Sequence, residues 1–155
     1  MISLALSLAL VVAHPSQDPE KEAINQVLDG LHQDAARADG AAYFDRFTPE
    51  ARFIGTDAQE HWSLEAFKAY ASPYFDQGKG WTYQPSERTV TVADIPCRCV
   101  AWFDEQLDNA SYGRLRGSGV LRLTDGGWKV EQYVLSFAVP NDRSRAVVDA
   151  IKQAD

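Results

Sequence analysis

Four long segments in the second half of the chain alternate between apolar and polar residues, and short turns separate them. They cover residues 81–92, 97–108, 112–124 and 128–139. A period of two residues is typical of strands with one buried face. Asp125-Gly126-Gly127 is a strong hairpin signal between the last two segments. Consecutive hairpins predict an antiparallel meander, and a sheet of such long strands must twist and curve.

The first half of the chain has helical periodicity. Apolar residues recur at helical spacing after Asp18, which we expect to be the N-cap, and Asp39-Gly40 ends this first helix. A short second helix is expected over 41–47 and a short strand over 51–55, and a third helix begins after the N-cap Ser63. Helices segregated from an antiparallel meander indicate the α+β class. We therefore expect a curved antiparallel sheet with three helices covering its concave face.

The beginning of the chain has the character of an export signal. An apolar run from Leu4 to Ala13 is too short to span a bilayer, which takes about 20 residues, but has the length of a signal-peptide core. No lysine or arginine precedes the run, and a buried N-terminal helix is the alternative interpretation. We predict a periplasmic or secreted protein. The expected organisation is a signal peptide over 1–13, a linker over 14–19, one domain over 20–142 and a helical tail over 143–155.

The charge and the cysteine count limit the partners of such a domain. The net charge is −7, which argues against a nucleic-acid partner because a phosphate backbone would repel it. Cys97 and Cys99 are the two cysteines. On one strand their Cα atoms would lie about 6.6 Å apart, at the far edge of disulfide geometry, so free thiols are expected. The histidines have no clustered partners, so we expect no metal site, and no cofactor motif is present.

Several segments together resemble a known superfamily. They are Phe53-Ile54-Gly55-Thr56-Asp57 with Trp62, Val100-Ala101-Trp102-Phe103-Asp104-Glu105, and residues 112–121, 128–133 and 136–142. In this order and spacing the chain resembles the nuclear transport factor two-like superfamily, in its SnoaL-like branch, over residues 20–142. The resemblance implies a cone-shaped barrel with a pocket at its wide end, and commonly a homodimer through the outer sheet face.

The resemblance does not imply one activity, because one fold hosts many functions. The superfamily includes ketosteroid isomerase, polyketide cyclases, dehydratases and members that only bind or scaffold. The positions that hold the isomerase's catalytic residues do not line up by motif with this chain. In SnoaL-like proteins the face corresponding to Trp128 and Gln132 lines the pocket, and Val134 makes this wall more apolar here.

Strand alternation then selects candidates on the segment 97–108. Trp102 and Asp104 share the face that we assign to the inside of the sheet. Asp104 is interpreted as a general base with a pKa raised by apolar surroundings. The alternative is a carboxylate paired with Arg114 or Arg116 on the adjacent strand.

The remaining candidates lie on the next strand and on one loop. Arg116 is either a clamp for a carboxylate or a solvated side chain, and the following Gly117-Ser118-Gly119 either leaves room for a bulky group or bends the sheet. Trp62 either closes the pocket mouth or packs under the next helix. In the first interpretation Asp57 or His61 contacts the ligand. Four other aromatic residues are expected in the core or an interface: Tyr43, Tyr70, Trp81 and Phe103.

The expected function is an exported domain that binds a small, partly apolar ligand without a cofactor. Asp104 is the candidate catalytic residue. The candidate ligand-binding residues are Asp57, Trp62, Trp102, Arg116 and Gln132. One alternative is an isomerase, cyclase or dehydratase that works by acid–base catalysis, and another is a dimeric accessory module that binds protein. We expect a homodimer, and no membrane contact after processing.

Overall fold

The computed structural model describes residues 18–154, and the predicted signal peptide lies outside the described residues. The elements in chain order are α1 (Pro19–Ala36), α2 (Gly40–Asp45), β1 (Phe47–Ile54), β2 (His61–Ser63), α3 (Leu64–Phe75), β3 (Gln84–Val92), β4 (Val100–Asn109), β5 (Gly113–Thr124), β6 (Gly127–Phe137), the 3-10 turn η1 (Asn141–Arg143) and α4 (Ser144–Ala154). The side chains of Asp18 and Ser63 cap α1 and α3 as predicted. Asp39 caps α2.

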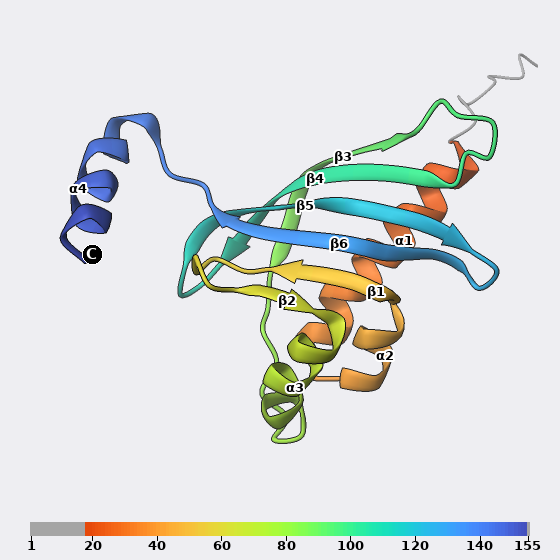
Figure 1. The fold of residues 1–155 in the computed structure, drawn as a ribbon, viewed down its shortest axis with the longest axis horizontal. Helices are drawn as coiled ribbons and strands as arrows, with labels where there is room; N and C mark the ends of the chain where they lie inside the picture. Colours follow the sequence, from red (N-terminus) through yellow and green to blue (C-terminus); the bar gives the residue numbers. More distant parts are fainter. Residues whose placement is uncertain (1–17, 155) are drawn as a thin grey trace, which may run out of the picture.

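The six strands form one curved, unclosed sheet in the order β2-β1-β6-β5-β4-β3. β3 to β6 form the predicted antiparallel meander, and β1 adds to β6 in parallel. α1 crosses one face of the sheet, and α2 and α3 lie beside β1 and β2 (Figure 1). The predicted α+β architecture, a curved sheet with three covering helices, is therefore confirmed.

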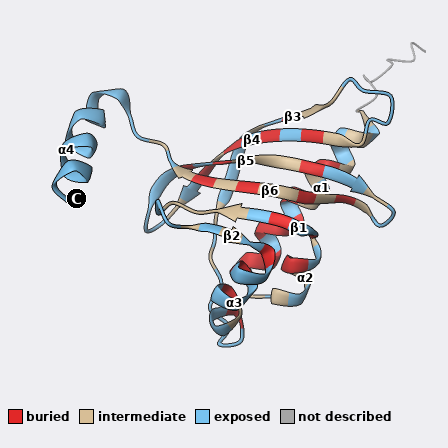
Figure 2. Ribbon diagram, in the orientation of Figure 1, coloured by how far each residue is buried: buried red, intermediate tan, exposed pale blue. Residues whose placement is uncertain are grey.

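The buried face of β4 is the opposite of the one that we predicted. Ala101, Phe103 and Leu107 point toward the helices and are at most 3% exposed, whereas Trp102 is 49% exposed and Asp104 is also exposed. The alternation of buried and exposed residues along the strand is visible in Figure 2. The periodicity was correctly identified, but the face with the higher apolar content is the one that the helices cover.

The two cysteines form a disulfide bond, so the prediction of free thiols is wrong. The prediction assumed that both cysteines belong to a strand, but β4 begins only at Val100. Cys97 and Cys99 lie in a turn in which Arg98 has a left-handed φ of 45°. The turn brings their Cα atoms to 5.1 Å, within disulfide geometry.

α4 extends away from the sheet at the end of β6 (Figure 1). Its apolar side chains Val147, Val148 and Ile151 are between 38% and 60% exposed. None of the helices in the described part of the chain is both long enough and apolar enough to span a membrane.

Candidate functional site

A cavity of about 190 Å³ lies between the helices and the sheet. Its lining comes from α1, α2, α3, β1, β2, β6 and the loops before β2, β3 and β5. Most of the lining side chains are aromatic. Three of the residues predicted to be core or interface, Tyr43, Tyr70 and Trp81, line this cavity, whereas Phe103 is buried in the core.

One wall of the cavity is a row of aromatic rings, which we call the ring wall: Tyr133, Phe53, Trp62 and Tyr70. The strand register creates it, because Phe53 pairs with Trp62 on β2 and with Tyr133 on β6. The rings of Phe53 and Tyr133 are 5.7 Å apart and 4° from parallel. Tyr70 on α3 continues the row at 4.7 Å from Trp62.

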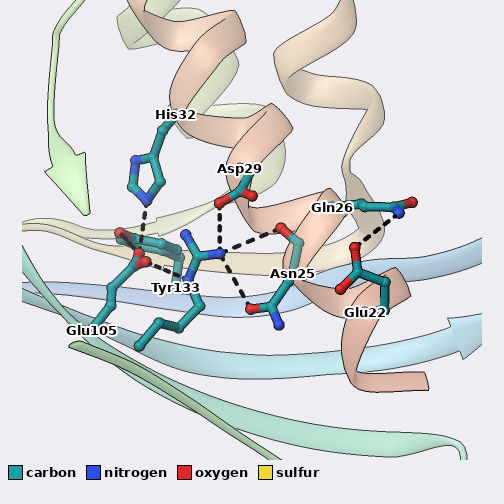
Figure 3. A network of polar contacts seen from close by, with 8 residues as sticks. Glu22, Asn25, Gln26, Asp29, His32, Glu105 and Tyr133 are labelled. Atoms are coloured by element: carbon teal, nitrogen blue, oxygen red, sulfur yellow. Dashed lines mark hydrogen bonds and ion pairs between the residues drawn. The ribbon is translucent and has the colours of Figure 1, made fainter. Parts of the chain in front are cut away.

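A buried ionic cluster meets the ring wall at Tyr133 (Figure 3). His32 on α1 also lines the cavity, and its Nε2 lies 2.7 Å from Oε1 of Glu105 on β4. The Tyr133 hydroxyl donates to the same oxygen at 3.2 Å, and Arg88 Nε donates to Glu105 Oε2 at 2.8 Å. Glu105 is only 1% exposed, so these donors take the place of water around its carboxylate.

The cluster keeps Glu105 ionised. Burial would raise the pKa of Glu105, but the hydrogen bond from His32 and the positive charge and hydrogen bond of Arg88 outweigh burial and lower that pKa below its ordinary value. Burial raises the pKa of Tyr133 well above its ordinary value, and the Glu105 charge adds to this effect. Tyr133 is therefore a hydrogen-bond donor at neutral pH.

The ionised carboxylate determines how His32 presents itself to the cavity. A carboxylate only accepts hydrogen bonds, so the proton between the two groups belongs to His32 Nε2. Within the described residues His32 Nδ1 has no hydrogen-bond partner. This atom is also not fully enclosed by protein. A neutral His32 would thus offer the lone pair of Nδ1 to a molecule in the cavity.

Gly117 on β5 makes room for this cluster. A Cβ atom at this position would lie 2.4 Å from the Tyr133 hydroxyl and 3.0 Å from Glu105 Oε1. Of the two interpretations of Gly117-Ser118-Gly119, the geometry at Gly117 supports the first, in which a missing side chain leaves space for a larger group.

Of the predicted ligand-binding residues, Trp62 is the one that lines the cavity. Asp57 lies in the adjacent loop, where Gly55, Thr56 and Glu60 contribute to the lining, and its backbone N–H donates to Glu60 Oε2. The structure therefore brings together only the part of the predicted site around the β1–β2 loop.

Trp102, Asp104, Arg116 and Gln132 do not lie at the cavity. The first three are exposed on the sheet face away from the helices, which the reversed face of β4 explains. Gln132 was assigned by uninterrupted alternation from Trp128, but β6 has a register shift at this point, where Val120 pairs with Gln132 and Leu121 pairs with Val130. The extra residue reverses the alternation, so that Tyr133 faces inward instead.

Sequence reasoning missed His32, Arg88, Glu105 and Tyr133. A signal for Glu105 was present, because it is the one charged residue on the strand face that carries Ala101, Phe103 and Leu107. His32 follows Leu31 on the buried side of α1. In the sequence this position indicates an ordinary core histidine and not a site residue. The described residues contain no group of three or more histidine, cysteine or acidic side chains positioned to hold a metal ion.

Comparison with known families identifies the domain. The SnoaL-like domain matches residues 24–140, which is most of the chain. The protein belongs to the SnoaL-like family. No curated protein matches it. Solved structures similar to this SnoaL-like domain share its fold at low sequence identity.

Three of these structures illustrate the similarity. A cystatin-like domain from Nostoc punctiforme has a TM-score of 0.66 at 16% identity, covering 86% of this chain and 86% of that one. A proposed dehydratase of the nuclear transport factor 2-like family from Streptomyces avermitilis has a TM-score of 0.65 at 11% identity, covering 79% and 98%. A nuclear transport factor 2-like protein from Pseudomonas putida has a TM-score of 0.61 at 14% identity, covering 76% and 85%. At these identities the SnoaL-like domain shares with them a fold.

Proposed function

We propose that this SnoaL-like domain binds a small planar ring compound that carries a hydroxyl group. The observation that carries the proposal is the ring wall, which ends beside His32, where Nδ1 has no partner within the described residues. A planar ring would stack along the wall or against its edges, and its hydroxyl would donate to His32 Nδ1. Mostly aromatic lining with few polar groups is the usual composition of a small-molecule site.

The cavity volume limits the size of the ligand. An apolar cavity of about 150 Å³ is large enough to bind benzene. The cavity of about 190 Å³ therefore has room for one or two fused rings and is too small to enclose a steroid-sized molecule.

Two matched probes test this proposal. We expect 2-naphthol to bind more tightly than 2-methoxynaphthalene, by roughly 2- to 12-fold for a net hydrogen bond of about 0.5–1.5 kcal/mol. His32→Gln should abolish this preference, because the glutamine amide still donates toward Glu105 but lacks the Nδ1 acceptor. Equal affinities for the two probes in the wild-type protein, measured by calorimetry, would refute the hydroxyl-binding role of His32.

A second candidate is acid–base catalysis at the same place, with His32 instead of Asp104 as the base. It is favoured by the His32–Glu105 pair, in which a buried carboxylate orients an imidazole that lines the cavity. Burial, with smaller contributions from Tyr112 and Glu60, raises the pKa of Tyr83 to about 12. Tyr83 also lines the cavity and would remain a donor to an oxygen that gains negative charge.

The step we envisage is removal of a proton from a carbon next to a carbonyl group. The proton moves to His32 Nδ1 while the carbonyl oxygen accepts a hydrogen bond from Tyr83. Transfer of the same proton from His32 to another carbon of the substrate completes an isomerisation. Loss of a hydroxide from the neighbouring carbon, with protonation to water, would instead give a dehydration. The proposed dehydratase from Streptomyces avermitilis shares this fold, which supports the dehydration variant of the proposal.

Hydrogen exchange measures this activity without the natural substrate. We expect the protein to accelerate exchange of the α-hydrogens of 2-tetralone in D₂O, followed by NMR, and His32→Gln to return the rate to the background. Asp104→Asn should have no effect, because Asp104 lies on the opposite face of the sheet. Absence of acceleration in the wild-type protein, with 2-naphthol still binding, would leave a binding domain without this chemistry.

We further propose that the domain functions in the periplasm or outside the cell. The apolar run from Leu4 to Ala13 supports export, and the disulfide between Cys97 and Cys99 suits an oxidising compartment. Mass spectrometry of the protein from its own host should give a chain that begins at His14. A chain that retains Met1 would contradict export by this signal.

A further inference from the structure

β3 carries one extra residue where it passes Glu105. The flanking pairs are Ser86 with Gln106 and Thr89 with Asp104. Two residues, Glu87 and Arg88, therefore share the place opposite the single residue Glu105, which is the arrangement of a β-bulge. Glu87 has a left-handed φ of 49°, uncommon for a residue other than glycine.

The side chains of the two bulge residues, Glu87 and Arg88, point in different directions. The Glu87 carboxylate accepts a hydrogen bond from Gln106 Nε2 at 2.6 Å and is exposed. Arg88 instead points under α1 and its side chain is 11% exposed. Bulges are frequent beside active sites, where they redirect a side chain.

Arg88 joins both elements that hold the proposed site. Its Nε donates to Glu105 Oε2 at 2.8 Å on β4, and its Nη1 donates to Asp29 Oδ1 at 2.7 Å on α1. The same Nη1 is 3.3 Å from Asn25 Oδ1 and 3.4 Å from the Asn25 carbonyl oxygen. Asp29 precedes His32 on α1 by nearly one helical turn (Figure 3). Arg88 therefore contacts both the helix that carries the imidazole and the carboxylate that orients it.

Besides its contacts, Arg88 supplies the positive charge that balances the buried carboxylate of the cluster. Glu105 carries one buried negative charge, and either Arg88 or a protonated His32 can balance it. Arg88 is always positive, so its contact neutralises Glu105 without a charge on His32. Three other titratable groups face the cluster. The Tyr133 hydroxyl from β6 is neutral, and so is Tyr83 from the segment before β3, whose ring lies 6.4 Å from that of His32 and whose pKa is raised by burial. Asp29 from α1 is half exposed and contacts the far side of Arg88.

We propose that Arg88 is a positioning residue that acts through Glu105 to keep His32 uncharged, with its proton on Nε2 and its lone pair on Nδ1. The purpose of this arrangement rests on the proposed function, since the lone pair is what a ligand hydroxyl or an acidic C–H group would meet. The arrangement itself exists without a ligand and can be measured directly.

Nitrogen NMR of the imidazole rings tests the proposal in the ligand-free full chain at neutral pH. Three histidines are present, and His32→Gln identifies the signals of His32. We expect the wild-type protein to show a protonated Nε2 and an unprotonated Nδ1. In Arg88→Met and Arg88→Gln, which remove the charge, Nδ1 should gain a proton, because a proton then replaces the missing positive charge.

Two further variants separate charge from structure. Arg88→Lys keeps the positive charge and should keep Nδ1 unprotonated. Arg122→Met is the matched control, because Arg122 pairs with Glu50 and Glu131 on the same sheet but not with Glu105. A charged His32 in the wild-type protein, or an unprotonated Nδ1 in a folded uncharged variant, would overturn the proposal. A charged His32 in the wild-type spectrum overturns the proposal even if neither uncharged variant folds, and Arg88→Lys then shows whether a retained positive charge keeps Nδ1 unprotonated.

The same samples distinguish this inference from the proposed function. The preference for 2-naphthol over 2-methoxynaphthalene should disappear in Arg88→Gln and remain in Arg122→Met. If the imidazole protons of the wild-type protein and of the uncharged Arg88 variants are placed as expected but neither probe binds, the role of Arg88 stands and the ligand proposal fails. If the probes bind as expected but His32 is charged, the ligand proposal stands and the role of Arg88 fails.

Discussion

Glu105→Gln should destabilise the protein much more than its small change in shape suggests. Glu105 is 1% exposed and accepts hydrogen bonds from His32, Arg88 and Tyr133. The amide leaves the buried Arg88 guanidinium without a counter-charge on the sheet. Breaking one side of a buried ion pair typically costs about 3–5 kcal/mol. For a domain of this size that corresponds to a fall in Tm of roughly 10–15 °C.

Urea unfolding at neutral pH measures the loss, and Glu131→Gln is the matched control. Glu131 also pairs with an arginine, Arg122, but both groups are partly exposed and screened by solvent, so a much smaller loss is expected. The double variant Arg88→Met with Glu105→Gln should lose less than the sum of its single variants, because neither charge is then left unpaired. If Glu105→Gln and Glu131→Gln lost the same amount of free energy, the buried charge would not hold the cluster together.

The pH dependence of stability gives an independent check. Because folding lowers the pKa of Glu105, its contribution to stability is fully present above the ordinary glutamate pKa of about 4.3. It is lost as the pH falls through the lower pKa of the folded state. We therefore expect the wild-type protein to lose more stability on acidification through this range than Glu105→Gln does. Parallel pH profiles would contradict an ionised Glu105.

Three further substitutions test other parts of the structure. Gly117→Ala should destabilise the protein by about 1–3 kcal/mol in urea unfolding, because its Cβ would meet the Tyr133 hydroxyl, whereas a Cβ at Gly126 has no neighbour closer than 3.7 Å. Phe53→Leu should weaken 2-naphthol binding roughly fivefold by removing one ring of the wall, and unchanged affinity would show that the ligand lies elsewhere. Trp102→Asp should convert the expected homodimer to a monomer in analytical ultracentrifugation if the outer sheet face forms the interface, since this side chain is 49% exposed there.

Local sequence signals were sufficient for the helix starts and for the antiparallel meander. Side-chain caps at Asp18 and Ser63 begin helices where predicted, and the four alternating segments became β3 to β6. These features depend on neighbours within a few residues, so one sequence reveals them. The parallel pairing of β1 with β6 joins segments about 80 residues apart, and no local pattern in the sequence indicated it.

The site was harder to predict because it depends on which face of each strand is buried. Alternation gives two faces but does not say which one the helices cover, and this ambiguity placed Asp104 inside and Glu105 outside. Alternation also fails across a bulge, as it did for Gln132 on β6. The partners of Glu105 come from α1, β3 and β6, so only the assembled fold brings them together.

The bulge at Glu87 and Arg88 lies in a strand at the edge of the sheet, which has consequences for solubility. Among the strands of residues 18–154, β3 pairs with β4 alone, so its outer backbone groups are available to pair with another molecule. The bulge twists this edge, Pro85 provides no N–H group, and Glu87 adds an exposed charge. Straightening β3 by removing the extra residue would create a template for uncontrolled strand addition, and the variant would be prone to aggregate.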